Sequence, residues 1–266
     1  MMRFLPLLLA VLLLPLPASA WQASVNAGKP GPHLRIKPVQ LRYVLSWDGK
    51  LNSGDMTFIF GRPDKRYPRH FIAQAYGGSS GIAKTFYPYK YSFTSILNKA
   101  DYTPAVFIGN EVDGKERKET SNRYGGSVKS TEVTVPLKKG AAKTTRTTFF
   151  SYSKSTVHDF LSAILYIRSL PLKNGDRATM VLHPFASPYL AKVTVLGREA
   201  HRGRDCIRLG LELQKIDRAT MKLRSYKKMK SATMWITDDA ERLPIEIRSK
   251  VFVGDVRAVL TERKFL

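Results

Sequence analysis

The clearest hydrophobic pattern in this chain lies between Thr156 and Asp176, where apolar residues recur at helical spacing. Phe160, Ile164 and Ile167 fall at positions i, i+4 and i+7, which lie on one face of a helix. The residues that extend this apolar face are Leu161, Ala163, Leu165 and Tyr166. A helix that is apolar most of the way round is buried in a core. The pattern therefore predicts one buried helix at about 156–170.

Polar and turn-forming residues mark the two ends of this helix. Thr156 is placed to cap its start, and Asp159, three residues later, can complete a capping box. Pro171 cannot continue a helix and disfavours helical angles at the residue before it. The sequence Asn174-Gly175-Asp176 then predicts a turn.

Most of the remaining chain alternates apolar and polar residues with the period of a half-buried strand. The alternation is clear from Leu41 to Trp47, and Asp48-Gly49-Lys50 then predicts a hairpin turn. Another turn is expected at 110–114. The segment 87–96 is either a strand or a short helix. The strands expected elsewhere are 38–47, 51–60, 69–76, 101–109, 110–118, 127–135, 147–152, 177–182, 189–196, 206–214, 221–230, 232–237, 243–253 and 256–261.

These elements predict a mainly β protein in one domain. About a dozen strands and one buried helix suggest a large curled antiparallel sheet, resembling half a barrel, around the helix at about 156–170. The last three strands are expected to form a meander. Residues 38–266 would form this domain, and the Gly- and Pro-rich segment 21–37 is expected to be an N-terminal tail or linker.

The first 20 residues have the features of a cleavable signal peptide. Arg3 is followed by an apolar run from Phe4 to Leu16, and Ala18-Ser19-Ala20 forms a cleavage signature before Trp21. The alternative is an uncleaved membrane anchor, but the run is short for a membrane span. We therefore expect an exported protein that resides in the periplasm or outside the cell.

The chain is strongly basic. Its 44 Lys and Arg residues against 21 Asp and Glu residues give a formal net charge of +23, which favours contact with polyanions. The alternative is a solvated basic surface without a specific role. The single cysteine, Cys206, excludes an intramolecular disulfide and is expected to be a small buried side chain.

Three features could carry catalysis or metal binding, and each has a structural alternative. Residues 77–81 match G-x-S-x-G, but the residues after Ser79 are poor helix formers, so a Gly/Ser loop is favoured over a hydrolase site. Asp238, Asp239 and Glu241 could act in acid–base chemistry, but aspartates at a strand junction favour a turn. The histidines lack metal-ligand spacing, so neither a metal nor another cofactor is expected; they are His33, His70, His158, His183 and His201.

Three segments carry a resemblance to a bacterial exported family, domain of unknown function 3108. They are Arg42–Phe58, Asp159–Asp176 and Met234–Leu260. The positions that resemble the family signature are Asp159, Ser162, Arg168, Gly175, Asp239, Pro244 and Gly254. The resemblance implies a β-rich domain that is periplasmic or faces the outer membrane, with a fold similar to periplasmic lipoprotein carriers. It implies no reaction.

A curled sheet with one helix can leave an apolar groove between them, and the alternative is an ordinary filled core. The residues expected to line such a cavity are Trp47, Phe58, Phe160, Ile164, Ile167 and Trp235. The candidates for an anion-binding site are Arg168, Arg224, Lys228 and Lys230. Arg168 could instead complement the dipole of its own helix, and the lysines could guard an exposed sheet edge.

The first hypothesis is an exported, non-enzymatic envelope protein that binds or carries an amphiphile or an anionic envelope component, with peripheral membrane contact. The alternative is a basic structural protein that docks on lipopolysaccharide or acidic polymer. An enzyme acting on envelope material, such as a hydrolase, is the third, because no catalytic constellation is convincing. Basic loops with aromatic residues occur, but no nucleic-acid-binding motif does, so specific nucleic-acid binding is not expected.

Overall fold

A computed structural model describes residues 21–33, 37–152, 156–226, 229–251 and 254–266 of the chain. The predicted signal peptide, residues 1–20, lies outside the described residues. The described part is mainly β, with two α-helices and one short 3-10 helix, η1 (Gln22–Ser24).

The strands before the long helix follow one another as hairpins. They are β1 (Val39–Trp47), β2 (Leu51–Pro63), β3 (His70–Ser79), β4 (Tyr89–Asn98), β5 (Pro104–Asp113), β6 (Glu116–Tyr124), β7 (Ser127–Pro136) and β8 (Thr144–Ser151). A short helix, α1 (Gly81–Phe86), connects β3 to β4. This helix corrects the prediction of a poor helix former after Ser79. The turn predicted at 110–114 lies later, because Asp113 ends β5 and accepts hydrogen bonds from the backbone N–H groups of Lys115 and Glu116.

The second half of the chain contains the long helix, α2 (Phe160–Ser169), and the remaining strands. They are β9 (Val157–His158), β10 (Arg177–Leu182), β11 (Tyr189–His201), β12 (Arg204–Ile216), β13 (Leu223–Ser225), β14 (Met229–Thr237), β15 (Pro244–Val251) and β16 (Gly254–Phe265). The predicted meander is confirmed by the antiparallel pairing of β14 with β15 and of β15 with β16. The strand predicted at 221–230 is wrong in extent, since β13 covers three residues and β14 begins at Met229.

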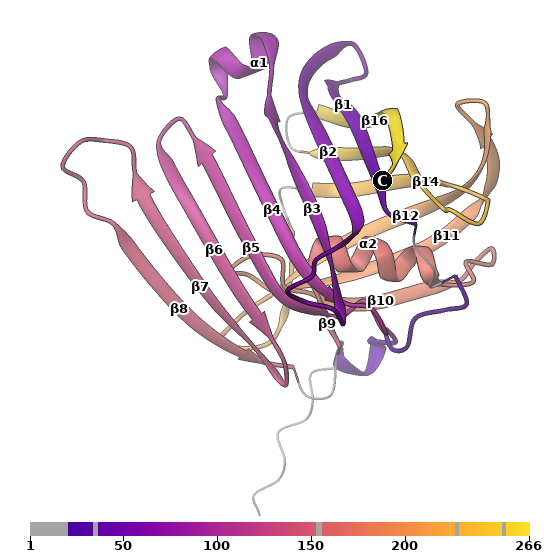
Figure 1. Ribbon diagram of the computed structural model, residues 1–266, viewed down its shortest axis with the longest axis horizontal. Coiled ribbons are helices and arrows are strands. Elements are labelled where there is room, and N and C mark those ends of the chain that lie inside the picture. Colours follow the sequence, from indigo (N-terminus) through magenta and orange to yellow (C-terminus); the bar gives the residue numbers. More distant parts are fainter. Residues whose placement is uncertain (1–20, 34–36, 153–155, 227–228, 252–253) are drawn as a thin grey trace, which may run out of the picture.

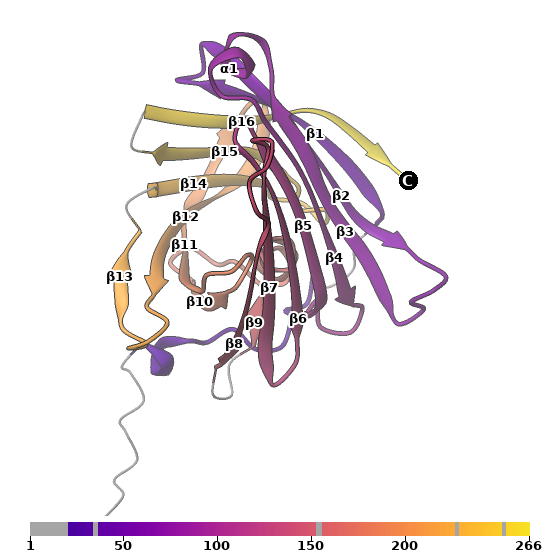
Figure 2. The same cartoon turned by 90° about the vertical axis from the view of Figure 1, so that its left-hand side faces the viewer.

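All of these strands belong to one sheet, whose order is β8-β7-β6-β5-β4-β3-β2-β1-β16-β15-β14-β12-β11-β10-β9, with β13 beside β12. Neighbours are antiparallel except β9 and β10. The end strands β8 and β9 do not pair with each other in the described part of the chain, so the sheet curls without closing. Figure 1 shows β2 to β8 as one wall of the curled sheet, the first wall. The strands β10 to β16 run across behind it and form the second wall. Figure 2 shows the two walls from the side.

Helix α2 lies inside the curl, between the two walls (Figure 1). Leu161 and Leu165 pack into the core cluster formed largely by β1 to β5. Tyr166 and Ile167 pack on the opposite side into a cluster formed by β10 to β14. The predicted fold class, a curled antiparallel sheet around one buried helix, is confirmed.

The segment 21–33, expected to be a tail or linker, packs against helix α2 and the sheet. Trp21 is buried and donates its indole N–H to the carbonyl of Met221 at 2.7 Å. The backbone N–H of Gly31 donates to Ser169 Oγ at 3.1 Å. A Cβ at Gly31 would lie 2.3 Å from the carbonyl oxygen of Ser169, so only glycine allows this approach.

Candidate ligand cavity and surrounding polar clusters

The two ends of helix α2 are fixed by side chains that determine where the cavity wall lies. Asp159 caps the helix and accepts the N–H of Ser162 at 2.8 Å, and Ser95 of β4 donates to its other oxygen. The prediction that Thr156 is the cap was wrong, because Val157 and His158 form strand β9 before the helix starts. The orphan N–H groups of the first turn thus find their acceptor in Asp159.

At the other end of α2, Arg242 donates to the carbonyl oxygens of Arg168, Leu170 and Pro171. A cation at a helix C-terminus satisfies the last carbonyls and complements the helix dipole. The sequence assigned this role to Arg168 as an alternative, but Arg242, which follows β14, performs it. No local sequence pattern links two residues so far apart in the chain.

An apolar cavity of about 230 Å³ lies between α2 and the concave face of the second wall. The helix contributes Phe160, Ala163, Ile164 and Ile167. The sheet contributes Met180, Leu182, Ala191, Val193, Leu211, Leu213, Ala232, Met234 and Ile247, and Lys192, Glu212 and Ser249 complete the lining. The cavity exists because alanines face it from the helix, from β11 and from β14, where larger side chains would fill the space.

The cavity is partly open, since Phe160, Ile164 and Ile247 are only half-buried. An empty apolar cavity of this volume, about 230 Å³, would cost about 5.5 kcal/mol if it were fully enclosed, at about 24 cal/mol per Å³. Cavities of about 150 Å³ with similar linings bind small apolar molecules. The arrangement is therefore suited to an apolar ligand.

A row of aromatic side chains leads from the cavity wall along β4. Phe160 packs edge-on against Phe93 with ring centroids 5.4 Å apart, and Phe93 stacks with Tyr91 at 5.0 Å. Tyr89 lies 5.7 Å beyond Tyr91 and donates its hydroxyl to Glu111. Phe93 is buried in the core, whereas Phe160, Tyr91 and Tyr89 are half-buried, so these three are the members of the row that solvent reaches.

Of the six residues predicted to line a cavity, Phe160, Ile164 and Ile167 do so. Phe58 instead lies in the filled core, packed against Tyr43 and Phe60.

Trp47 stands at the end of β1, where its indole nitrogen would lie 2.8 Å from a Cβ placed on Gly254. Trp235 also lies away from the cavity, because it packs with Cys206 and Ile245 rather than with the helix. The sequence did not predict that Met234, its neighbour, would line the cavity instead.

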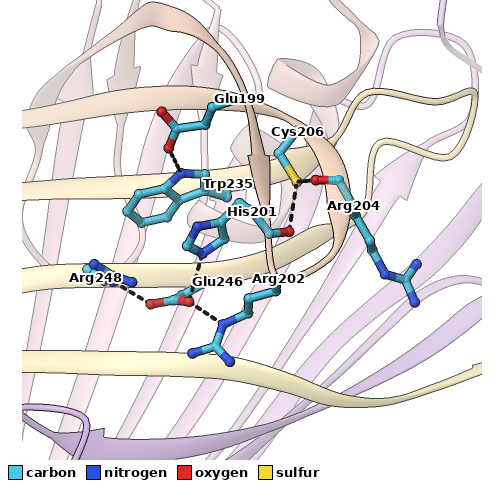
Figure 3. Close-up of polar contacts among 8 residues, drawn as sticks. All are labelled: Glu199, His201, Arg202, Arg204, Cys206, Trp235, Glu246 and Arg248. Atoms are coloured by element: carbon cyan, nitrogen blue, oxygen red, sulfur yellow. Dashed lines mark hydrogen bonds and ion pairs between the residues drawn. The ribbon is translucent and has the colours of Figure 1, made fainter.

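Trp235 belongs to a polar cluster centred on the buried Glu246 (Figure 3). The Glu246 carboxylate accepts hydrogen bonds from His201 at 2.9 Å, from Arg202 and from Arg248. Burial alone would raise its pKa, but these donors outweigh burial and hold the pKa at about 2. Sequence analysis missed this cluster, although Glu246 and Arg248 alternate with the apolar Ile245 and Ile247.

Cys206 is buried beside this cluster, and its thiol contacts the carbonyl oxygens of His201 and Arg204 at 3.8 and 3.4 Å (Figure 3). Burial raises the pKa of the thiol, which disfavours the reactive thiolate. The expected buried position of this cysteine is confirmed.

The predicted anion-binding residues are not brought together. Arg168 is buried, donates to the carbonyl of Glu241 at 2.6 Å and lies over the ring of Phe60. Burial lowers the pKa of its guanidinium to about 10. Arg224 is exposed on β13 and pairs with Asp217 at 2.8 Å. Lys228 and the side chain of Lys230 lie outside the described residues.

A serine–histidine contact at the start of α2 lacks access for a substrate. His158 Nδ1 lies 3.1 Å from Ser162 Oγ, and both residues are fully buried. The same hydroxyl lies 3.0 Å from the carbonyl oxygen of Asp159. Burial lowers the pKa of His158 to about 4, so this histidine is neutral at pH 7, and burial raises the pKa of Asp159 to about 6, so this carboxylate takes up a proton more readily than an exposed aspartate does.

The other candidate catalytic groups have structural partners. Ser79 Oγ accepts the backbone N–H of Tyr89 at 2.9 Å, and the pocket beside it is lined by no histidine among the described residues. Asp239 accepts the side-chain hydroxyl of Thr237 and two backbone N–H groups, which shapes the turn between β14 and β15 as predicted. Asp238 pairs with Arg198 at 2.6 Å.

The other signature positions of the resemblance also have structural roles. Gly175 follows α2 with a positive φ of 84°, and Gly254 has a φ of 133° beside Trp47. Pro244 accepts a hydrogen bond from the hydroxyl of Tyr43 at 2.6 Å.

In the described ranges, no group of three or more His, Cys, Asp or Glu side chains is arranged to hold a metal ion. No helix in that part of the chain is long and apolar enough to cross a membrane.

The fold and the cavity define a curled-sheet β protein with an internal helix. The chain matches the model of the family described as "Protein of unknown function (DUF3108)" over residues 42–261. Because this match covers most of the chain, the protein belongs to that family, as the resemblance implied. A comparison with curated proteins finds no match.

Among solved structures, the chain is similar to a beta-barrel-like protein of domain of unknown function DUF1849 from Brucella abortus. The identity is 8%, the alignment covers 87% of this chain and 99% of that one, and the TM-score is 0.55, which shows a shared fold. The lipoprotein LppX of Mycobacterium tuberculosis is 8% identical over 84% of each chain, with a TM-score of 0.23. A protein with a YmcC-like fold from Bacteroides fragilis is 8% identical over 89% of this chain and 98% of that one, with a TM-score of 0.31.

Proposed function

We propose that this protein is an exported, non-enzymatic envelope protein that binds the apolar chain of an amphiphile between α2 and the sheet. The observation that supports it best is the apolar cavity of about 230 Å³. Ligand sites are concave and mostly apolar, with few polar groups, and this cavity matches that description. Phe160, Ile164 and Ile167 would contact the chain directly.

The size of the cavity limits what it can hold. Its volume of about 230 Å³ corresponds to roughly eight water molecules at about 30 Å³ each, so it accommodates part of a long chain. The aromatic row from Phe160 to Tyr89 would cover the remainder and bring the head group to the end of β4. Each methylene buried along this path contributes about 0.8 kcal/mol.

The proposal of export is supported by the signal-peptide pattern in residues 1–20, and an exported protein would meet membrane amphiphiles. The absence of enzymatic activity is part of the proposal. It is supported by the structural partners of Ser79, Ser162 and Asp239 described above.

The proposal can be tested with an environment-sensitive fluorescent fatty acid. Ile164→Trp introduces a large ring into the cavity, whereas Ile108→Trp makes the same change on β5, where Ile108 is 43% exposed. We expect the wild type and Ile108→Trp to bind the probe equally, and Ile164→Trp to lose at least about tenfold in affinity. Circular dichroism would confirm that both variants are folded.

Competition by an unlabelled fatty acid or lysophospholipid would show that the probe occupies the amphiphile site. Equal binding by all three proteins, or no binding by the wild type, would contradict the proposal. Ala232→Leu, which fills the cavity from β14, gives a second variant in case Ile164→Trp does not fold.

A further inference from the structure

The convex face of the second wall carries two arginines that are oriented by one buried carboxylate (Figure 3). Arg248 donates through Nε to Glu246 Oε1, and Arg202 donates through Nε to Oε2. The Glu246 side chain is fully buried, whereas the side chains of Arg202 and Arg248 are 46% and 35% exposed. The carboxylate thus fixes the inner edge of each guanidinium and leaves the rest toward the surface.

The terminal Nη groups of both arginines remain available. Neither Arg202 nor Arg248 makes a hydrogen bond through Nη1 or Nη2 to another described residue. A guanidinium presents its donors in a planar fork that matches the oxygens of phosphate and carboxylate groups. The two guanidinium groups flank one anchoring carboxylate and therefore offer several preoriented donors at this surface.

Further contacts make the arrangement rigid. Trp235 lies with its ring centroid 4.8 Å from the Arg248 guanidinium, and His201 stacks on the same indole at 4.4 Å. The indole N–H of Trp235 donates to Glu199 at 2.7 Å. Because its side chains are already held in place, the site loses little conformational entropy when a ligand binds.

Positive charge is in excess on this face. Arg248 stands directly opposite Arg257 in the pairing of β15 with β16, and like charges in that position repel. The neighbouring pairs Arg208–Glu199 and Arg257–Asp255 are balanced, so one carboxylate, that of Glu246, faces two arginines. An external anion would compensate the remaining charge.

We propose that Arg202 and Arg248 form a binding site for an oxyanion, a phosphate or carboxylate group, on the convex face. This site is separate from the apolar cavity and does not depend on the proposed amphiphile binding. The ligand could be a small free anion or the head group of an anionic lipid, since both present the same oxygens.

Two measurements on the protein without residues 1–20 separate these sources. Isothermal titration with inorganic phosphate tests free anions. Sedimentation with vesicles of phosphatidylcholine, with and without phosphatidylglycerol, tests the head group. The test variant is R202Q/R248Q, and the control is R42Q/R198Q, which removes the same charge from arginines that pair with Glu262 and Asp238.

We expect the wild type and R42Q/R198Q to bind phosphate or anionic vesicles, and R202Q/R248Q to lose at least about tenfold in affinity. If the protein binds inorganic phosphate but not anionic vesicles, the ligand is a free oxyanion. If it binds anionic vesicles, the ligand is a lipid head group. Equal losses in both double variants, or no binding by the wild type in either arm, would overturn the proposal. R202Q alone replaces the double variant if that variant does not fold.

Discussion

The two faces of the second wall differ sharply although the same strands build both. On the concave face, Met234 and Ile247 line an apolar cavity. On the convex face, their neighbours Trp235, Glu246 and Arg248 form an ionic cluster. Successive side chains on a strand point to opposite faces, so a step of one residue separates the two environments.

This difference shows that strand register decides which side chains face the cavity and which face the ionic cluster. The concave face is apolar and partly unfilled, so we propose that it is completed by a ligand chain. The convex face satisfies a buried charge with several donors and keeps donor groups at the surface. The following variants perturb one face or the other.

The largest effect is expected from Glu246→Gln. The substitution keeps the shape of the side chain but removes the charge that Arg202, Arg248 and His201 satisfy. We expect a loss of about 3 kcal/mol in the free energy of unfolding, at the lower end for a broken buried ion pair because both arginines are partly exposed. Urea denaturation would measure it. Glu262→Gln removes an exposed carboxylate and should change little; equal losses would contradict the assigned role of Glu246.

Acid should destabilise the region around the start of α2 through two buried histidines. Burial lowers the pKa of His158 from 6.5 to about 4 and that of His183 from 6.5 to about 3. Each neutral histidine therefore contributes its full stability above pH 6.5. This contribution is lost as the pH falls from 6.5 toward the pKa of that histidine in the folded protein. At pH 5 each histidine should cost about 2 kcal/mol, at about 1.4 kcal/mol per pH unit.

The pKa of Asp159 shifts in the opposite direction, from 3.8 to about 6. Its contribution to stability is lost as the pH rises through about 6, so a fall in pH restores part of the stability that the histidines lose. The variant His158→Asn should lose about 2 kcal/mol less than the wild type between pH 7 and pH 5. Denaturation at pH 7 and at pH 5 measures the loss of stability in each protein. Equal losses in the variant and the wild type would show that His158 does not titrate as expected.

A smaller effect is expected at the helix cap. Asp159→Ala removes the acceptor of the Ser162 N–H and should cost about 1–2 kcal/mol at pH 7. Asp159→Asn keeps an acceptor oxygen and removes a buried charge, so it should stay within about 0.5 kcal/mol of the wild type. A larger loss in the Asn variant than in the Ala variant would exclude the capping role.

The smallest effect is expected from filling the cavity. Ala232→Leu places apolar atoms in empty space and should raise the free energy of unfolding of the ligand-free protein by about 1 kcal/mol. The matched change Ala200→Leu, at an exposed position of β11, should leave it unchanged. Destabilisation by Ala232→Leu would show that the cavity is already filled by side chains.

The sequence was sufficient to predict features that depend on local periodicity. The apolar face Phe160, Ile164 and Ile167 identified both the helix and one wall of the cavity. The closing meander followed from three strand patterns separated by turn residues.

Features that depend on long-range contacts could not be predicted. Arg242 caps α2 from a turn more than 70 residues later. Trp235 was predicted to line the cavity, but the pairing that places Met234 inward is set by neighbouring strands. Thr156 and Asp159 match a capping box by sequence, but the pairing of β9 with β10 places the start of the helix after Asp159, which is therefore the cap.

The central claim is that the concave cavity holds an amphiphile. Native mass spectrometry of the protein, isolated without detergent from the cells that produce it, tests this claim most directly. We predict a second mass that exceeds the protein mass by one lipid or glycolipid, and that disappears in Ile164→Trp but persists in Ile108→Trp. A single mass equal to that of the protein alone, or the same adduct in both variants, would contradict the account.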